Sequence, residues 1–243
     1  MTAQNTLRIG LLSPEGTNSR HFGHFEKLLP PEIRLSMEGL GLIRTSRYDL
    51  RGKSDEVLKR ALEFAQKHSL HGLIITGAPL AILNPGLETK VSQAVGIPVV
   101  TAVSSAIAAL RAVGAKKLVV MTPFDDAMNE SLKSDLQRSG FSVLACPTFE
   151  DPTVGAGARI APEELFARTA REFGEAGDAD AIYFQGARLD PVPIIERLEQ
   201  SLGVSVIASN PAMLWNLLSR LGWRCPVAGY GRLLANWPAP IAH

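Results

Sequence analysis

Few side chains in this chain are suited to moving protons, and most of them stand just after short apolar runs. Glu15 follows the run LRIGLLSP, while Asp125 and Asp126 follow LVVMTP. His21 comes soon after Glu15. A carboxylate or an imidazole acts as a general acid or base when it is held within hydrogen-bond reach of a reacting group. Acidic residues at such positions are also common for a second reason, because they stabilise the start of a helix.

Two glycines indicate a site for an anion. Gly77 ends the run GLIITG, and Gly186 ends AIYFQG. A glycine directly after a buried strand lets backbone N–H groups approach a ligand, and a following helix adds the positive end of its dipole. Arg188 could then bind a substrate carboxylate through its planar guanidinium. The competing interpretations are that the glycines only permit tight turns, and that Arg188 forms a salt bridge to Asp190 or to another lobe.

These residues belong to an internal repeat. Gly77 and Gly186 stand 109 positions apart, and so do Pro14 and Pro123, which end the runs LRIGLLSP and LVVMTP. The stretch at 97–114 also recurs in altered form at 204–222. A period of this length is too long for a solenoid unit, so it predicts two copies of one lobe.

The elements that must position these residues are buried strands alternating with amphipathic helices. This pattern predicts an α/β fold of two pseudo-symmetric, Rossmann-like lobes with parallel sheets. We assign residues 1–115 and 223–243 to the first lobe and 116–222 to the second, and expect GYGRLL at 229–234 to pack across the first lobe. Ligands of parallel α/β sheets bind outside the carboxyl ends of the strands, so we expect one cleft between the lobes. Its floor would be the loops after Leu12, Ile75, Met121 and Phe184.

Composition excludes several classes of partner. The 25 Lys and Arg residues nearly balance the 24 Asp and Glu residues, so neither nucleic acid nor an anionic membrane is expected as a partner. The apolar runs are shorter than a membrane span and no secretory signal pattern opens the chain, so we expect a cytoplasmic protein. Cys146 and Cys225 lack metal spacing and are expected to be reduced. No zinc, phosphate-loop or GxSxG motif occurs, and no metal or cofactor is expected.

Several stretches together resemble a known group of enzymes, the aspartate/glutamate racemase superfamily. Within it the chain is most similar to the arylmalonate decarboxylases and next to the maleate cis-trans isomerases. The resemblance implies two α/β lobes with the site between them, cofactor-free chemistry on a small carboxylic or dicarboxylic acid, and a possible homo-oligomer. The stretches that carry it are GLGL at 39–42 with Tyr48-Asp49, TAVSSAIAALRAVGAKKLVV, Asn129-Glu130 after Thr122-Pro123, RLEQSLGVSVIASNPAMLW, and GYGRLL.

The chain departs from that group at the reacting positions. The superfamily places cysteine at one or both of two mirrored positions, which correspond here to Gly77 and Gly186. The hydroxyl groups that bind the reacting carboxylate in the decarboxylases correspond to Ala78, Pro79 and Phe124. A positioned proton donor is typically worth ~10²–10⁴-fold in rate, and an oxyanion donor about 10²–10³-fold. The expected enzyme is therefore decarboxylase-like or isomerase-like, with acid–base chemistry that does not use cysteine.

The expected site joins both lines of reasoning. Asn18 is included because it falls where maleate isomerases carry a functional asparagine. Two other functions stay open: a catalytically silent carboxylate-binding protein of the same fold, and an enzyme for a ring amide or a nitrogen heterocycle. The acid–base candidates are Glu15, His21, Asp125 and Asp126. The substrate-binding candidates are Ser13, Pro14, Thr17, Asn18, Gly77, Ala78, Pro79, Thr122, Phe124, Asn129, Gly186, Ala187 and Arg188.

Overall fold

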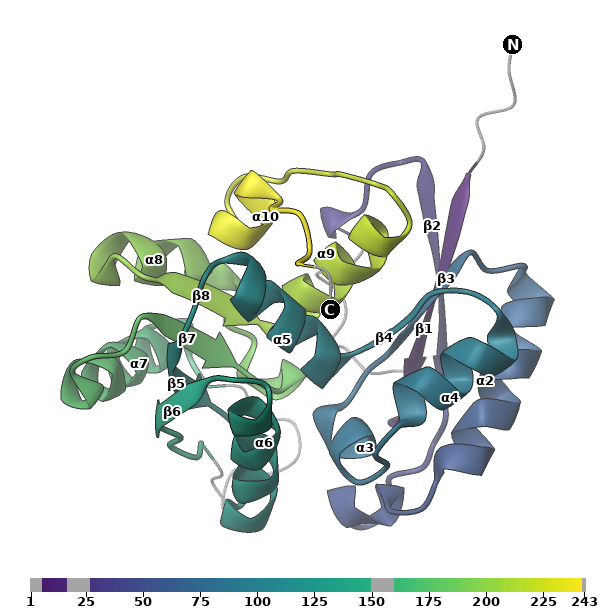
Figure 1. The fold of residues 1–243 in the computed structure, drawn as a ribbon, viewed down its shortest axis with the longest axis horizontal. Helices are drawn as coiled ribbons and strands as arrows, with labels where there is room; N and C mark the ends of the chain where they lie inside the picture. The colour runs from purple at the N-terminus through teal and green to yellow at the C-terminus, as the bar shows by residue number, and fades with distance from the viewer. Residues whose placement is uncertain (1–5, 17–26, 150–159, 242–243) are drawn as a thin grey trace.

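The computed structural model describes residues 6–16, 27–149 and 160–241. The chain forms two lobes, each built on a four-stranded parallel sheet (Figure 1). The strand order is β2–β1–β3–β4 in the first sheet and β6–β5–β7–β8 in the second, which is the same order displaced by four strands. The predicted α/β fold of two pseudo-symmetric lobes is therefore confirmed.

The first lobe begins with a buried strand, and its longest helix is amphipathic. Val57, Ala61 and Phe64 form the buried side of that helix, α2, at the spacing of successive helical turns. The elements are β1 (Leu7–Ser13), β2 (Ile33–Gly39), the 3₁₀ helix η2 (Arg47–Leu50), α2 (Ser54–His68), β3 (Gly72–Ile75), α3 (Ala78–Ile82), α4 (Leu87–Val95), β4 (Val99–Thr101) and α5 (Ala102–Ala112).

The second lobe repeats this plan, with short 3₁₀ turns after its third strand. The elements are β5 (Lys117–Met121), α6 (Asp126–Arg138), β6 (Ser142–Ala145), α7 (Pro162–Ala176), β7 (Ala181–Phe184), η3 (Ala187–Leu189), η4 (Val192–Ile194), α8 (Ile195–Leu202), β8 (Ser205–Ala208), α9 (Ser209–Arg220) and α10 (Arg232–Asn236).

Strand register brings the expected loops together. In the first sheet Leu12 pairs with Ile75, and in the second Met121 pairs with Phe184. The strands run parallel, so each pair of neighbouring strands ends at the same level. The loop that follows each strand therefore lies beside the loop of its neighbour, as the rule for parallel sheets requires.

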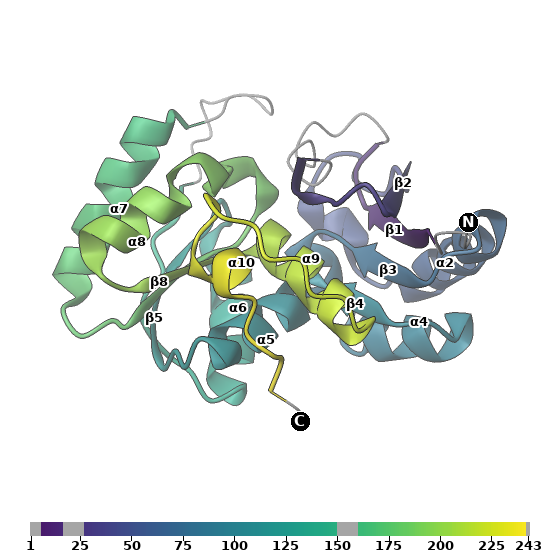
Figure 2. The ribbon, with the colours of Figure 1, turned by 90° about the horizontal axis from the view of Figure 1, so that it is seen from above.

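Helices α5 and α9 join the lobes. They pack on each other between the two sheets, and α9 also contacts β3 and β4 of the first lobe (Figures 1 and 2). Asn216 Nδ2 donates to Ser105 Oγ at 3.2 Å across this helix pair. Gly72 allows the close approach of α9, because a Cβ at that position would lie only 2.8 Å from Leu217 Cδ1. The two sheets thus share one apolar core.

The carboxyl-terminal segment corrects one prediction. We expected GYGRLL to pack across the first lobe, but α10 packs on α9 and β8. The Arg232 backbone N–H donates to Glu199 Oε2 on α8 at 2.7 Å. Gly231 makes this docking possible, because a side chain there would collide with Ile195. The fit of this segment to the second lobe is a long-range match that local pattern does not reveal.

Candidate functional site

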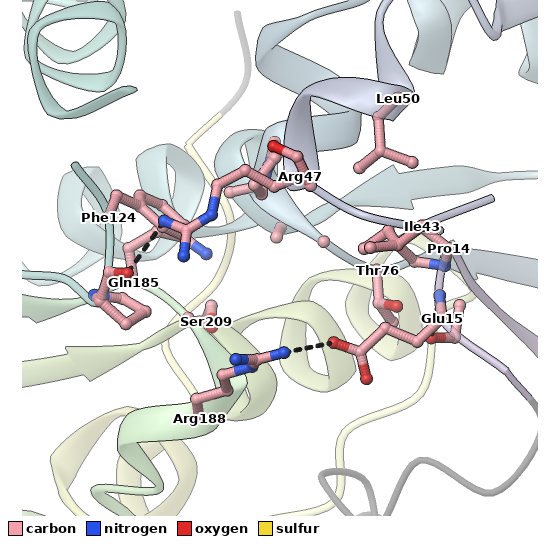
Figure 3. A pocket seen from close by; sticks show the side chains of 18 of the residues that line it. Pro14, Glu15, Ile43, Arg47, Leu50, Thr76, Phe124, Gln185, Arg188 and Ser209 are labelled. Carbon is pink, nitrogen blue, oxygen red and sulfur yellow. Dashed lines mark hydrogen bonds and ion pairs between the residues drawn. The ribbon is translucent and has the colours of Figure 1, made fainter. Parts of the chain in front are cut away.

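A cavity of about 490 Å³ lies between the lobes at the ends of the strands. Its lining comes from the loops after β1, β3, β5 and β7, from residues 43–47 and from the start of α9 (Figure 3). All four expected loops contribute to it. Segment 43–47 was not expected to do so, although the Tyr48-Asp49 pair beside it was noted in the sequence.

The loops after β1 and β5 have the same construction. Ser13 Oγ accepts a hydrogen bond from the Glu15 N–H, and Thr122 Oγ1 accepts one from the Phe124 N–H, both at 3.2 Å. Each hydroxyl thereby holds the residue after the proline in place. Ser13 and Phe124 line the cavity, whereas Thr122 does not.

Asn129 supports the Phe124 loop from behind. It accepts a hydrogen bond from the Thr122 hydroxyl and donates from Nδ2 to the Phe124 carbonyl oxygen at 3.3 Å. Asn129 is buried and does not line the cavity. The structure thus places two predicted substrate-binding residues, Thr122 and Asn129, behind the wall that they hold.

The two mirrored glycines are required by backbone geometry and by close packing. Gly77 has φ +83° and Gly186 has φ +110°, a region that residues with a Cβ rarely adopt. A Cβ at Gly77 would lie 2.7 Å from Pro14 Cγ, and one at Gly186 would lie 2.7 Å from Pro123 Cδ. Each glycine therefore packs against the proline ring of the neighbouring loop. A side chain at either position would fit only if that proline moved.

A pair of opposite charges bridges the lobes inside the cavity. Arg188 Nη2 lies 3.8 Å from Glu15 Oε1 (Figure 3); the Arg188 side chain is exposed and that of Glu15 is partly buried. Of the interpretations open for Arg188, the structure shows the ion pair with another lobe. At this separation the pair is loose, and it is open to competition from an anionic ligand.

The residues that mirror this ion pair are apolar. In the repeat Glu15 corresponds to Phe124 and Arg188 corresponds to Pro79. Ala78 and Pro79 are buried and line the cavity where α3 begins. Ala187 mirrors Ala78 and opens η3. At these mirrored positions the site has a charged pair, Glu15 and Arg188, and an apolar pair, Phe124 and Pro79.

Segment 43–50 joins the first lobe to the second beside Phe124. Arg47 Nη1 donates to the Pro123 carbonyl oxygen at 2.9 Å, and its guanidinium carbon lies 5.3 Å from the centre of the Phe124 ring. The Tyr48 hydroxyl donates to Asp125 Oδ1 at 2.6 Å. These contacts tie η2 to the loop after β5 and close one side of the cavity.

The hydrogen bonds of Asp125 suit a structural role. Its carboxylate accepts from Tyr48 and from the Met128 N–H, and so caps α6. Burial acts to raise the pKa of Asp125, but these hydrogen bonds and the charge of Arg47 outweigh it, so the pKa lies below its usual value. Asp125 therefore stays ionised at neutral pH. Asp126 is exposed on α6 and does not line the cavity.

Thr17, Asn18 and His21 fall outside the described residues, so their predicted roles stay predictions. Neither cysteine lines the cavity, and burial raises the pKa of Cys146 to about 11 and that of Cys225 above its usual value. Within the part of the chain that the structure describes, His, Cys, Asp and Glu form no cluster of three that could hold a metal ion.

Several lining residues escaped the sequence analysis. Among them are Arg47, Thr76, Gln185 and Ser209. Gln185 offered a signal, because it is a polar residue at the end of the apolar run AIYFQG. Ser209 offered one through its place at the start of the repeated helix.

Comparison with known proteins finds one family. The Amdase family model, described as arylmalonate decarboxylase, matches residues 18–234. The arylmalonate decarboxylase of Bordetella bronchiseptica is 28% identical over 210 residues, which cover 84% of this chain and 88% of that protein. A maleate isomerase of Nocardia farcinica is 25% identical over 171 residues, or 65% of this chain and 66% of that one.

Solved structures agree with this result. Unliganded arylmalonate decarboxylase superposes with a TM-score of 0.80 at 25% identity, covering 95% of this chain and 100% of that one. The maleate isomerase Iso of Pseudomonas putida has a TM-score of 0.77 at 19% identity, covering 95% and 99% of the two chains. At 19% identity, the similarity to the maleate isomerase shows a shared fold.

Proposed function

The chain belongs to the arylmalonate decarboxylase family, and on that premise we propose that it is a cofactor-free decarboxylase for a small dicarboxylic acid with an apolar substituent. Family membership makes it an enzyme of the decarboxylase or isomerase kind. The choice of substrate and the roles of individual residues are the proposal. They rest on the geometry of the cavity between the lobes.

The observation that carries the proposal is that one cavity holds both an ion pair and several apolar side chains. Arg188 and Glu15 lie 3.8 Å apart across it. Phe124, Pro79, Ile43 and Leu50 contribute apolar side chains to its lining, and Arg47 lies over the Phe124 ring. A ligand that contacts both sets needs a carboxylate for the Arg188 guanidinium and an apolar group for these side chains.

We assign the anchoring of a substrate carboxylate to Arg188. Its ion pair with Glu15 is long, at 3.8 Å, so a substrate carboxylate can replace Glu15 at the guanidinium. The exchange would leave the Glu15 carboxyl group beside the bound substrate.

The proton balance of the reaction requires an acid that protonates the α-carbon. Decarboxylation breaks the bond between the substrate's α-carbon and one carboxylate, and that carboxylate leaves as CO₂. The electron pair stays on the α-carbon, which then takes a proton. Among the acid–base candidates in the described ranges, Glu15 and Asp125 line the cavity, and hydrogen bonds from Tyr48 and the Met128 N–H hold Asp125 at the start of α6. We assign the proton transfer to Glu15.

The test is turnover of phenylmalonate by the purified protein, followed as formation of phenylacetate. We expect E15Q to lower kcat by at least ~10²-fold, because a positioned acid contributes that much or more. The matched control is D126N, which removes an exposed carboxylate outside the cavity and should leave kcat unchanged.

Other results would redirect the proposal. Full activity in E15Q would mean that another group, or water, delivers the proton. Tight binding of phenylmalonate without turnover would favour the silent carboxylate-binding function. Conversion of maleate to fumarate in a parallel assay would favour an isomerase.

A further inference from the structure

The side-chain amide of Gln185 is buried in the cavity wall with half of its hydrogen-bonding capacity unused. The residue is 1% exposed and lines the cavity. Its Oε1 accepts a hydrogen bond from the Tyr183 hydroxyl, and its backbone N–H donates to the Met121 carbonyl oxygen at 2.9 Å. Among the residues that the structure describes, none accepts a hydrogen bond from Gln185 Nε2. Buried donors without a partner are rare and destabilising, so this amide calls for an explanation.

Tyr183 determines which end of the amide faces the cavity. It is fully buried, and this burial raises the pKa of its phenol far above the usual value, so the hydroxyl keeps its proton. That proton has one acceptor among the described residues, Gln185 Oε1. Were the amide turned over, the phenol proton would have no acceptor. The pairing with Tyr183 therefore presents the NH₂ group of Gln185 to the cavity.

Ser209 presents a second donor to the cavity. It is 4% exposed, and its hydroxyl makes no hydrogen bond with any residue in the described ranges. It is also the first residue of α9, and no side chain caps this helix. The mirrored helix α5 is different, because Thr101 and Ser104 cap its start reciprocally. The amino-terminal end of α9 therefore keeps its positive end available at the cavity.

We propose that Gln185 Nε2 and Ser209 Oγ, at the start of α9, form a subsite that binds a carboxylate oxygen of the substrate. The inference rests on the proposed function and assigns a specificity-determining role to Gln185. Figure 3 shows both residues on the side of the cavity that carries Arg188, across from Thr76 and Glu15. Neither group is acidic, so the subsite holds and orients the carboxylate and leaves proton transfer to another residue. Tyr183 acts through Gln185 and is a positioning residue.

The subsite supplies donors where neighbouring side chains of the lining have none. Ala78, Pro79 and Phe124 line the cavity with apolar side chains. The Phe124 N–H already donates to Thr122 Oγ1. A carboxylate beside these apolar side chains can find neutral donors in the loop after β7 and at the start of α9.

The decisive variant is the double substitution Y183F/Q185L, which removes both members of the buried pair. Replacing both partners with apolar groups of similar shape is nearly neutral or stabilising for folding. We therefore expect the ligand-free variant to melt at the wild-type temperature or above it. Binding of phenylmalonate, measured by titration calorimetry, should be about 10- to 100-fold weaker, as expected for lost hydrogen bonds to a charged group.

Two further variants test the second donor and provide a control for loss of a buried hydroxyl. S209A removes the second donor and should weaken phenylmalonate binding by roughly 10-fold. T169V is the control, because Thr169 is equally buried but its hydroxyl donates to the Leu165 carbonyl oxygen outside the cavity. It should lower the melting temperature and leave binding unchanged.

The outcomes separate this inference from the proposed function when phenylacetamide, a neutral ligand with one carbonyl oxygen, is titrated alongside. Wild-type binding of phenylmalonate in Y183F/Q185L, or a melting temperature that falls as in T169V, would overturn the role of Gln185 and leave the proposed function standing. If the wild type bound phenylacetamide alone, and the double variant lost it, the donor role of Gln185 would hold while the dicarboxylic substrate would be overturned. Binding of neither ligand would overturn both.

Discussion

Gly77 and Gly186 occupy mirrored positions in the two lobes, and each stacks on the proline of the neighbouring loop. Two residues further on the lobes differ, because the first has Pro79 where the second has Arg188. Glu15 and Phe124 differ in the same way. The repeat has kept the residues that shape the backbone around the cavity and has changed those whose side chains enter it.

The starts of α5 and α9 extend the comparison. Thr101 and Ser104 cap α5 with each other, and Glu88 accepts a further hydrogen bond from the Thr101 N–H at 3.0 Å. The start of α9 has no side-chain cap and lines the cavity. One lobe therefore satisfies its helix end internally, whereas the other leaves it available to a ligand. A pseudo-symmetric scaffold has become an asymmetric site.

The largest expected effect comes from breaking the charged pair. R188L should lower kcat/KM for phenylmalonate by roughly 10²–10³-fold, because it removes the only cation that we assign to the substrate carboxylate. F124L, at the apolar mirrored position, should lower it by about 10-fold or less, since one apolar group replaces another. Steady-state kinetics of the two variants measures the difference. Equal losses would contradict different roles for the charged and the apolar mirrored pairs.

The mirrored glycines should respond alike. G77A and G186A should each reduce the free energy of unfolding by roughly 2–4 kcal/mol, because the added Cβ meets a proline ring and the backbone becomes strained. Urea denaturation measures both losses. The double variant P123A/G186A should regain the free energy of unfolding that G186A loses through the clash with the proline ring. It should still lack the part that is lost because position 186 has a positive φ. A large loss in one lobe only would show that the two stacks are not equivalent.

Two substitutions at helix caps should change stability by smaller amounts and in opposite directions. T101A should cost about 1 kcal/mol of stability, because α5 loses its cap. A208S places a capping hydroxyl at the start of α9, so it should raise stability by up to about 1 kcal/mol and weaken phenylmalonate binding a few-fold. Thermal unfolding with and without ligand checks both. Tighter binding in A208S would argue against a ligand at this helix end.

Removal of the hydrogen bond between the Tyr48 hydroxyl and Asp125 should have the smallest effect. Y48F should cost about 1 kcal/mol at pH 7, because Asp125 loses a hydrogen bond donor. The folded pKa of Asp125 is lowered, so its contribution is present above the unfolded pKa of about 4 and is lost as the pH falls below it. The stability difference between wild type and Y48F should therefore shrink in acid. Denaturation at pH 7 and pH 3 tests this, and a constant difference would contradict it.

Much of the site could be located from the chain alone. The loops after Leu12, Ile75, Met121 and Phe184 were expected to converge, and the strand register does bring neighbouring loops to one level. Glu15 and Arg188 were recognised as candidates for the chemistry, and both line the cavity. These features follow from local patterns, since an apolar run that ends at a glycine or proline marks a strand end wherever it occurs.

Which loop residues face the ligand depended on contacts that no local pattern reports. Thr122 and Asn129 turn behind the wall because the Phe124 backbone takes up their hydrogen bonds. Gln185 presents its NH₂ group to the cavity because Tyr183, two residues earlier in β7, donates a hydrogen bond to its side-chain oxygen.

The amino-acid sequence by itself determined the two lobes, the cleft between them and the glycines at its floor, because repeat period and strand ends are local properties of the chain. The tertiary structure alone decided that α9 crosses to the first sheet, that α10 stays with the second lobe, and that Arg47 reaches Pro123. These contacts join residues far apart in the chain. Their formation depends on shape and hydrogen-bond partners that exist only once both lobes have folded.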